Sequence, residues 1–249
     1  MTLSTRRQNV LQALINEYIE SAHPVGSKRL VSHYLVDVSS ATVRNELMWL
    51  EDRGYVISPH TSSGRIPTNV GYRCFVNSLL LRPDMIQIQA QVGESRNIQK
   101  LRNSLLESEP VDYLQTVINA LMFLSSYVGC LAVAWTPKLS PTVHHRGLVT
   151  LLSQPEFHDT TTAIPLIQLL ESHGDLLAIL NEVQSTPGLH IRIGTEHADS
   201  QLYAFSMVAS RVGYQGTTGV IALFGPTRMD YRKAISALSA VISDIQRRP

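Results

Sequence analysis

The sequence of 249 residues has little cysteine, few charged residues and no strong excess of either charge. Its two cysteines, Cys74 and Cys130, lie far apart, which excludes a disulfide framework and a cysteine-rich metal site. Charged residues make up 16% of the chain and the formal net charge is +1, so overall charge does not by itself indicate nucleic-acid binding. A hydrophobic content of 44% is typical of a folded globular protein rather than a disordered one.

Long apolar runs are also scarce. The N-terminal residues MTLSTRRQNV contain no apolar run after the arginines, so we expect no secretory signal peptide. Residues 113–137 carry no charge, but their first half has apolar residues at helical spacing and their second half is a short apolar run. A buried helix followed by a buried strand is favoured over the alternative, a membrane span of about 20 predominantly apolar residues. We therefore expect a cytoplasmic protein with no membrane partner.

The charges are unevenly distributed along the chain. Residues 1–82 contain nine Lys and Arg against six Asp and Glu, a balance of +3, and the remainder has twelve against fourteen, a balance of −2. Arg82, Pro83 and Asp84 form the best linker candidate, so we predict domains at residues 1–82 and 83–249. A mildly basic first domain suits a local contact with DNA, although ordinary scatter of surface charge would give similar numbers.

The first domain has the order of elements of a winged helix-turn-helix. Apolar spacing and capping residues predict helices at residues 5–20 and 27–34, a third from Ser39 or Ser40 to Gly54, and a fourth at 68–81. Between the last two come a short apolar strand at 55–58 and a Ser-Gly-Arg loop at 59–67. A recognition helix followed by such a wing is how this class of domain reads duplex DNA.

The second domain alternates between helical and strand-like segments. Helices are predicted at residues 85–107, 111–127 and 230–246, with another at 166–180 that is interrupted near Gly174. Strands are predicted at 131–135, 189–193, 202–212 and 219–224. The expected fold class is α+β: an N-terminal winged helix-turn-helix, then an α+β domain with a mainly antiparallel sheet.

The third helix of the first domain supplies the candidate DNA-reading residues. Val43, Leu47 and Leu50 share one face and are expected to be buried, which leaves the opposite face for DNA. Asn45 can pair with adenine, the Ala41 methyl group can touch a thymine methyl, and Arg44 can read guanine or bind phosphate. Hydroxyl groups suited to phosphate or base edges come from Ser39, Ser40 and Thr42. The alternative is a solvated helix face, with Arg44 near Glu46 or Glu51.

The loop supplies a further cation. Ser63, Gly64 and Arg65 predict a tight hairpin with Arg65 near its tip, where it can enter the minor groove. The alternative is a flexible loop whose glycine serves the turn. Lys28, Arg29 and His60 are further candidates for contacts with phosphate. Arg6 and Arg7 are weaker candidates.

Long motifs at both ends of the chain carry a family resemblance. PVGSKRL, VSSATVRNELMWLEDRGYV and HTSSGRIPTNVGYR, together with LLSQPEF, HIRIGTEH and GVIALFGPTRMDY, closely resemble the heat-inducible transcription repressor family HrcA. The resemblance implies a winged helix followed by a GAF-like regulatory and dimerisation domain. It further implies a homodimer that binds an inverted repeat upstream of chaperonin operons. A GroEL-type chaperonin would keep the repressor active, and heat would relieve repression.

The sequence departs from that family pattern in two places. PKLSPTVHH at residues 137–145 runs almost directly into GLVTLLSQPEF, so an inserted segment linked to dimerisation, and strands of the second domain with it, are expected to be missing. Trp49 also stands where the family usually has a polar residue. It is expected to pack either against the wing or against another chain.

The remaining residue patterns give little support for a ligand-binding, metal or catalytic site. Residues 225–230, GPTRMD, suggest either an anion-binding turn or, as we favour, a structural turn that fixes the last helix. The histidines show no metal-ligand spacing, and no catalytic motif is present, so we expect no enzyme activity, cofactor or metal. Two alternative functions remain: an effector-sensing regulator, and a shortened interaction protein without independent operator binding.

Overall fold

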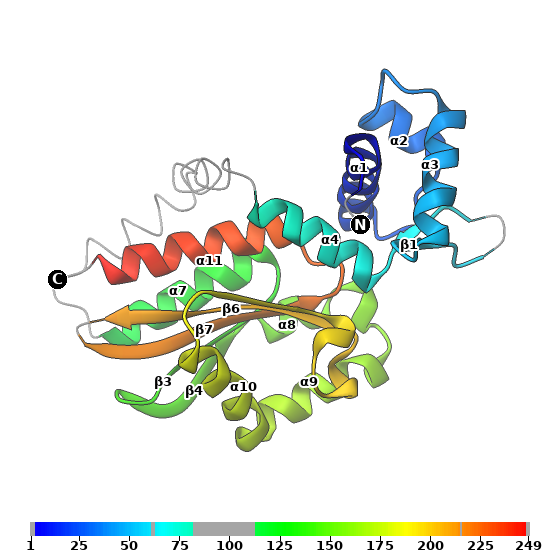
Figure 1. The fold of residues 1–249 in the computed structure, drawn as a ribbon. Helices are drawn as coiled ribbons and strands as arrows, with labels where there is room; N and C mark the ends of the chain where they lie inside the picture. The colour runs from blue at the N-terminus through cyan, green and yellow to red at the C-terminus, as the bar shows by residue number, and fades with distance from the viewer. Residues whose placement is uncertain (1–2, 61–62, 82–112, 215, 248–249) are drawn as a thin grey trace. The chain divides into compact units, whose positions relative to one another are not determined.

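The computed structural model describes residues 3–60, 63–81, 113–214 and 216–247. Contacts divide the chain into two compact units, Met1–Arg82 and Pro83–Pro249, which are described separately (Figure 1). The predicted helix at 85–107 and the predicted linker at 82–84 lie outside the described residues.

The described residues of the N-terminal unit form four helices and a two-stranded sheet. The helices are α1 (Thr5–Ser21), α2 (Ser27–His33), α3 (Ser40–Asp52) and α4 (Asn69–Leu80). The strands β1 (Val56–Ile57) and β2 (Ile66–Pro67) pair antiparallel and form the base of the wing. Buried apolar side chains from all four helices and β1 form its core, among them Leu14, Leu30, Leu50, Val56 and Val76.

Side-chain caps fix where two of these helices begin. The Ser39 hydroxyl accepts a hydrogen bond from the Thr42 backbone N–H at 3.1 Å, and the Thr68 hydroxyl accepts one from Gly71 at 3.1 Å. Each cap satisfies one of the backbone donors that a helix leaves unpaired in its first turn. The left-handed backbone of Gly54, with φ of 73°, follows the end of α3. The predicted starts of α3 and of the fourth helix are confirmed, and α3 ends at Asp52, two residues before the predicted stop at Gly54.

The C-terminal unit is built on a five-stranded antiparallel sheet. Its strand order is β4-β3-β7-β6-β5, from β3 (Leu131–Thr136), β4 (Ser140–Arg146), β5 (Leu189–Ile193), β6 (Phe205–Tyr214) and β7 (Thr217–Pro226). The α-helices of its described residues are α7 (Tyr113–Val128), α8 (Leu148–Leu152), α9 (Thr160–Glu171), α10 (His173–Ser185) and α11 (Tyr231–Gln246). Short 3-10 turns lie at Pro155–Phe157, Gly194–Glu196 and Ser200–Leu202.

Helices cover both faces of this sheet. In Figure 1, α7 and α11 lie along one face, and α9 and α10 lie on the other. The sheet face toward α9 and α10 carries Val133, Met207 and Phe224, which are fully buried. Because both faces are covered, β3 is buried along its whole length, which explains a continuous apolar run rather than an alternating one. The predicted α+β class is confirmed, as is the helix-then-strand interpretation of residues 113–137.

Three predictions for this unit were wrong in detail. No strand was predicted at residues 137–145, yet β4 lies there and pairs with β3 along one edge of the sheet. The helix predicted from residue 166 begins at Thr160, because Asp159 caps it by accepting a hydrogen bond from the Thr161 N–H at 2.9 Å. The strand predicted at 202–212 begins at Phe205, after a 3-10 turn.

Among the described residues no single helix is long and apolar enough to cross a membrane. Helices α9 and α10 pass that test only as a pair, and they are bent by 76° at their break. Their apolar residues Leu166, Leu169, Leu176 and Leu180 are buried against the sheet of the C-terminal unit.

Candidate nucleic-acid interface

Helix α3 divides into a buried face and an exposed face. Val43, Leu47 and Leu50 are buried, as the sequence predicts. Over its first turns the exposed side chains follow one another at helical spacing and are those of Ala41, Arg44, Asn45 and Met48, and Asp52 is exposed at its end. These first four residues, called here the exposed stripe of α3, include polar and apolar side chains and are accessible to a ligand.

The two polar side chains of that stripe are not engaged by the protein. Within the described part of the chain, neither Arg44 nor Asn45 makes an ion pair or a side-chain hydrogen bond. Glu46 is paired with Arg7 of α1 at 2.9 Å, and Glu51 is paired with Arg65 at 2.8 Å. The alternative in which Arg44 is held by one of these glutamates is therefore not what the structure shows.

The hydroxyl groups at the start of α3 are partly engaged. Ser39 caps the helix and its hydroxyl lies 2.9 Å from that of Thr42. The Ser40 hydroxyl lies 3.0 Å from that of Ser27, which joins the first residue of α3 to the first residue of α2. Of these contacts, only the Ser27–Ser40 contact joins the two helices, and all of these hydroxyl groups keep lone pairs or rotatable protons for a ligand.

Arg65 lies at the base of the wing and not near its tip, so that prediction was wrong. Its backbone pairs with Val25 through two hydrogen bonds, of 2.9 Å and 2.8 Å, immediately before β2. Its guanidinium reaches Glu51 of α3 and is only 22% exposed. The sequence pattern predicted the hairpin. It did not predict the pairing of Arg65 with Val25, which holds Arg65 against the rest of the N-terminal unit.

Gly64 serves this close approach rather than a turn. A Cβ at residue 64 would lie 2.4 Å from the carbonyl carbon of Val25, closer than any side chain can come. Its φ lies outside the left-handed region, so the turn itself does not require glycine. A glycine is needed because two backbones touch here.

A hollow of about 370 Å³ lies between the start of α2, the exposed stripe of α3 and the base of the wing. It brings together three of the predicted cations, Lys28, Arg44 and Arg65. Apolar atoms of Val25, Leu47 and Met48 line the rest together with small polar residues. A concave, basic and partly apolar surface at a recognition helix suits the edge of a DNA groove with its phosphates.

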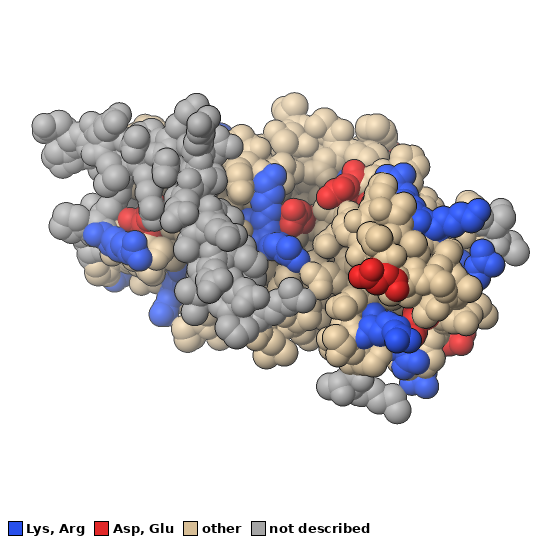
Figure 2. Space-filling view, turned by 90° about the horizontal axis from the view of Figure 1, so that it is seen from above, with Lys and Arg blue, Asp and Glu red and all other residues tan. Residues whose placement is uncertain are grey.

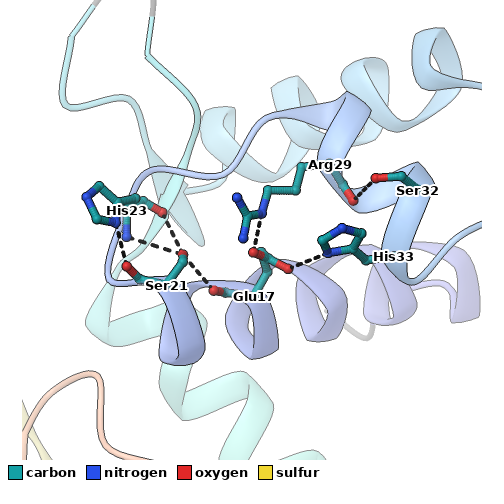
Figure 3. Close-up of polar contacts among 6 residues, drawn as sticks. All are labelled: Glu17, Ser21, His23, Arg29, Ser32 and His33. Carbon is teal, nitrogen blue, oxygen red and sulfur yellow. Dashed lines mark hydrogen bonds and ion pairs between the residues drawn. The ribbon is translucent and has the colours of Figure 1, made fainter.

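Arg29 and His60, two further predicted phosphate contacts, are not among the residues that line this hollow. Figure 3 shows Arg29 and His33 of α2 on either side of Glu17 of α1. Glu17 is only 1% exposed, and its carboxylate accepts hydrogen bonds from Arg29 Nε and, at 3.2 Å, from His33 Nδ1. A buried carboxylate needs such partners, so Arg29 has a structural role here. His60 is exposed in the wing loop, where its backbone contacts Ser63.

Trp49 packs against arginines on the flank of α3. The guanidinium carbon of Arg7 lies 3.7 Å from its ring centre, and that of Arg53 lies 4.8 Å away. Cation–π contacts of this kind contribute roughly 0.5 to 1 kcal/mol each at partly exposed sites. The two arginines that stack on Trp49 thus come from α1 and from the residue that follows α3.

Charge alone does not outline the interface. On the face of the N-terminal unit seen in Figure 2, Lys and Arg side chains lie among acidic ones and form no continuous basic band. Charge therefore marks out no site on that face, and the candidate site is defined by the hollow and the exposed stripe of α3.

The GPTRMD motif of the C-terminal unit has a structural explanation. Arg228 binds both carboxylate oxygens of Glu156, one of them at 3.1 Å. Asp230 caps α11 by accepting a hydrogen bond from the Lys233 N–H at 3.0 Å. The turn thus fixes the last helix, as favoured above. Over the described ranges, no three His, Cys, Asp or Glu side chains come together as a metal site requires.

Comparison with known protein families identifies the family to which this chain belongs. Residues 2–79 match the family described as "Winged helix-turn-helix transcription repressor, HrcA DNA-binding". Residues 76–235 match the "HrcA protein C terminal domain". The chain belongs to the HrcA family. It is a transcription repressor of the heat-inducible kind with a winged-helix DNA-binding domain, and DNA is its partner.

Individual relatives agree with this assignment. The chain is 28% identical to the heat-inducible transcription repressor HrcA of Roseiflexus castenholzii, over 98% of this chain and 94% of the relative. It is 29% identical to HrcA of Synechococcus sp. strain RCC307, over 99% of each. A crystal structure described as that of a hypothetical protein shares the fold, with a TM-score of 0.78, 17% identity and 98% of both chains covered.

The shortening relative to other HrcA proteins is visible in the same comparison. The alignment with the Roseiflexus protein spans 338 positions, 89 more than the 249 residues of this chain. At least that many positions are therefore occupied in the relative alone. The described part of the C-terminal unit nevertheless contains a continuous five-stranded sheet.

Proposed function

We propose that the chain represses chaperonin operons by binding an inverted-repeat operator as a homodimer. The observation that carries the proposal is the free stripe of α3. Ala41, Arg44 and Asn45 are exposed, and neither polar side chain of the three is engaged by the protein. An arginine and an asparagine that are free on a recognition helix can each make bidentate contacts with bases.

The remaining candidate residues have supporting roles in this proposal. Ser39, Ser40 and Thr42, at the start of α3, would donate to phosphate oxygens while they hold the helix in place. Lys28 is exposed beside the hollow and would bind phosphate, and His60 would do so from the wing loop. Arg65 would place the wing through Glu51, and the charge of Arg29 is already compensated by Glu17.

Dimerisation is central because an inverted repeat contains two equivalent half-sites. A two-fold symmetric dimer reads both, and the second contact is then an intramolecular event with a high effective concentration. A monomer would keep half of the phosphate contacts and bind weakly at physiological salt. We assign dimerisation to the C-terminal unit, in keeping with the family resemblance.

The same resemblance suggests regulation by a GroEL-type chaperonin, with heat relieving repression. A direct check is to add purified chaperonin to the repressor and titrate the operator. We expect a larger active fraction at an unchanged dissociation constant. An active fraction that chaperonin does not alter would remove this part of the proposal.

The basic test of the proposal is fluorescence anisotropy with a duplex carrying the inverted repeat and with a scrambled duplex, over a salt series. Operator preference by a factor of about 1,000 or more, with two protomers per duplex, is expected. Equal, salt-sensitive binding to both duplexes would contradict the proposal and favour the shortened interaction protein. A small molecule that switches the preference would favour the effector-sensing regulator.

A further inference from the structure

Met48 is an apolar side chain on the exposed stripe of α3. It is 52% exposed, whereas the neighbouring apolar residues Val43, Leu47 and Leu50 are buried. Single exposed apolar residues are common and need no explanation by themselves. The position of Met48 is what matters, because it lines the hollow together with Arg44 and the base of the wing.

The spacing of the stripe matches a known way of reading DNA. In three-helix domains of the homeodomain type, the recognition helix reads the major groove with residues at positions i, i+3, i+4 and i+7, and an asparagine at i+4 pairs with adenine. Ala41, Arg44, Asn45 and Met48 have this spacing, with the asparagine in the corresponding place, and all four are exposed. Met48 thus occupies the fourth position of this pattern.

The stripe ends at Met48. The next residue on the same side is Asp52, which is exposed and carries a negative charge. A carboxylate at this place would be repelled by phosphates. Contacts with bases are thus expected over the two turns from Ala41 to Met48 and not beyond.

The chemistry of methionine selects one kind of partner. A thioether has no proton to donate and no charge, so it cannot hold a phosphate or pair with a base edge as Asn or Arg does. Its long, unbranched and adaptable side chain suits an apolar contact. In the major groove the apolar feature that distinguishes one base is the C5-methyl group of thymine.

We propose that Met48 is a base-reading residue of the operator complex, in contact with the C5-methyl group of a thymine next to the base that Asn45 reads. This rests on the proposed function, since it needs the exposed stripe of α3 to lie in the major groove. It adds a specificity determinant that depends on a methyl group rather than on a hydrogen bond.

The experiment removes that methyl group from the DNA and the thioether from the protein. Thymines of the inverted repeat are replaced one symmetric pair at a time by deoxyuridine, which lacks only the C5-methyl group. The wild-type protein should lose about four-fold in affinity per half-site at one pair, the value expected for one buried methyl group. Met48→Ala should bind the thymine and deoxyuridine forms of that pair equally well.

Two further variants separate a specific contact from a general effect. Met122→Ala removes a methionine of similar exposure, 55%, from α7 of the C-terminal unit, and it should keep the full deoxyuridine penalty. Met48→Gln keeps the length of the side chain and should lose the penalty while preferring adenine at that position. Because residue 48 is exposed, both of its variants should melt like the wild type.

The outcomes distinguish this proposal from the proposed function. If the wild type prefers the operator but no deoxyuridine pair weakens binding, or if Met48→Ala retains the penalty, the role of Met48 is refuted and operator binding stands. If the wild type does not prefer the operator at all, both proposals fail.

Discussion

The backbone of Gly64 lies against that of Val25, so close that a Cβ at residue 64 would be 2.4 Å from the carbonyl carbon of Val25. The next residue, Arg65, completes the contact through two hydrogen bonds with Val25 and an ion pair with Glu51. The wing is thus attached to the segment just before α2 and to α3. The position of the wing relative to α3 therefore depends on the backbone contact of Gly64 with Val25 and on the ion pair of Arg65 with Glu51.

Gly64→Ala should therefore detach the wing. The added methyl group can be accommodated only if the two backbones separate, and we expect a loss of about 1 to 3 kcal/mol in the stability of the N-terminal unit. Operator affinity should fall with it. Gly26→Ala is the matched control for stability, because a Cβ there has no neighbour within 4 Å. Equal melting of the two variants would contradict the role given to Gly64.

The pairing of Arg29 with Glu17 predicts an asymmetry between two substitutions. Arg29→Ala leaves a carboxylate that is 1% exposed with His33 as its remaining ion-pair partner, and should cost about 3 kcal/mol of stability. Glu17→Gln should cost only about 1 kcal/mol, because the Arg29 side chain is 56% exposed and is solvated when released. Urea unfolding of the single and double variants measures both values. If Arg29→Ala lowers operator affinity and leaves stability unchanged, Arg29 is a phosphate contact after all.

His197 predicts acid lability in the C-terminal unit. The side chain is buried, and this burial, followed by the nearby charge of Arg192, lowers its pKa from the ordinary 6.5 to about 4. A depressed pKa means that the folded state is favoured fully above pH 6.5 and loses that contribution as the pH falls toward 4. The loss should be about 3 kcal/mol.

The measurement is thermal melting of the wild type and of His197→Leu at pH 7 and pH 4.5. The variant should show a smaller acid-induced drop in melting temperature than the wild type. His158→Leu, at an exposed histidine, serves as the control and should follow the wild type. An identical drop in all three proteins would remove His197 as a cause.

Gly147 joins β4 to α8, close to where a segment is expected to be missing from this chain. Its φ is 91°, and a Cβ there would lie 2.3 Å from the Cys130 carbonyl oxygen. Gly147→Ala should cost more than about 3 kcal/mol, since strain and overlap add. Gly188→Ala isolates the strain, because Gly188 has φ of 108° but no neighbour within 4 Å. If both variants lose equal stability in urea unfolding, the close packing at this junction is unimportant.

The sequence predicted those features that depend on local patterns. The spacing of Val43, Leu47 and Leu50 gave the buried face of α3, and Ser39 and Thr68 gave helix starts. Long-range pairings could not be predicted, because no local signal specifies them. Arg65 is drawn to the wing base by Val25 and Glu51, forty and fourteen positions away along the chain.

Strand β4 was missed for a related reason. Its sequence SPTVHHR has little apolar content, and its pairing is made through the backbone with β3 along one edge of the sheet. Helical spacing alone places Met48 beside Arg44 and Asn45, but it does not distinguish a side chain that reads DNA from one that is only solvated. The hollow beside Arg44 supplied the reason to prefer a reading role.

The central claim is that the exposed stripe of α3 reads operator bases, and Asn45 tests it most directly. The measurement is the ratio of operator to scrambled-duplex affinity for the wild type and for Asn45→Ala at one salt concentration. The account predicts that the ratio falls at least about ten-fold in the variant while affinity for the scrambled duplex is unchanged, since an asparagine–adenine pair contributes about 1 to 3 kcal/mol of discrimination. An unchanged ratio, with the variant folded as the wild type is, would show that α3 does not read the operator in this way.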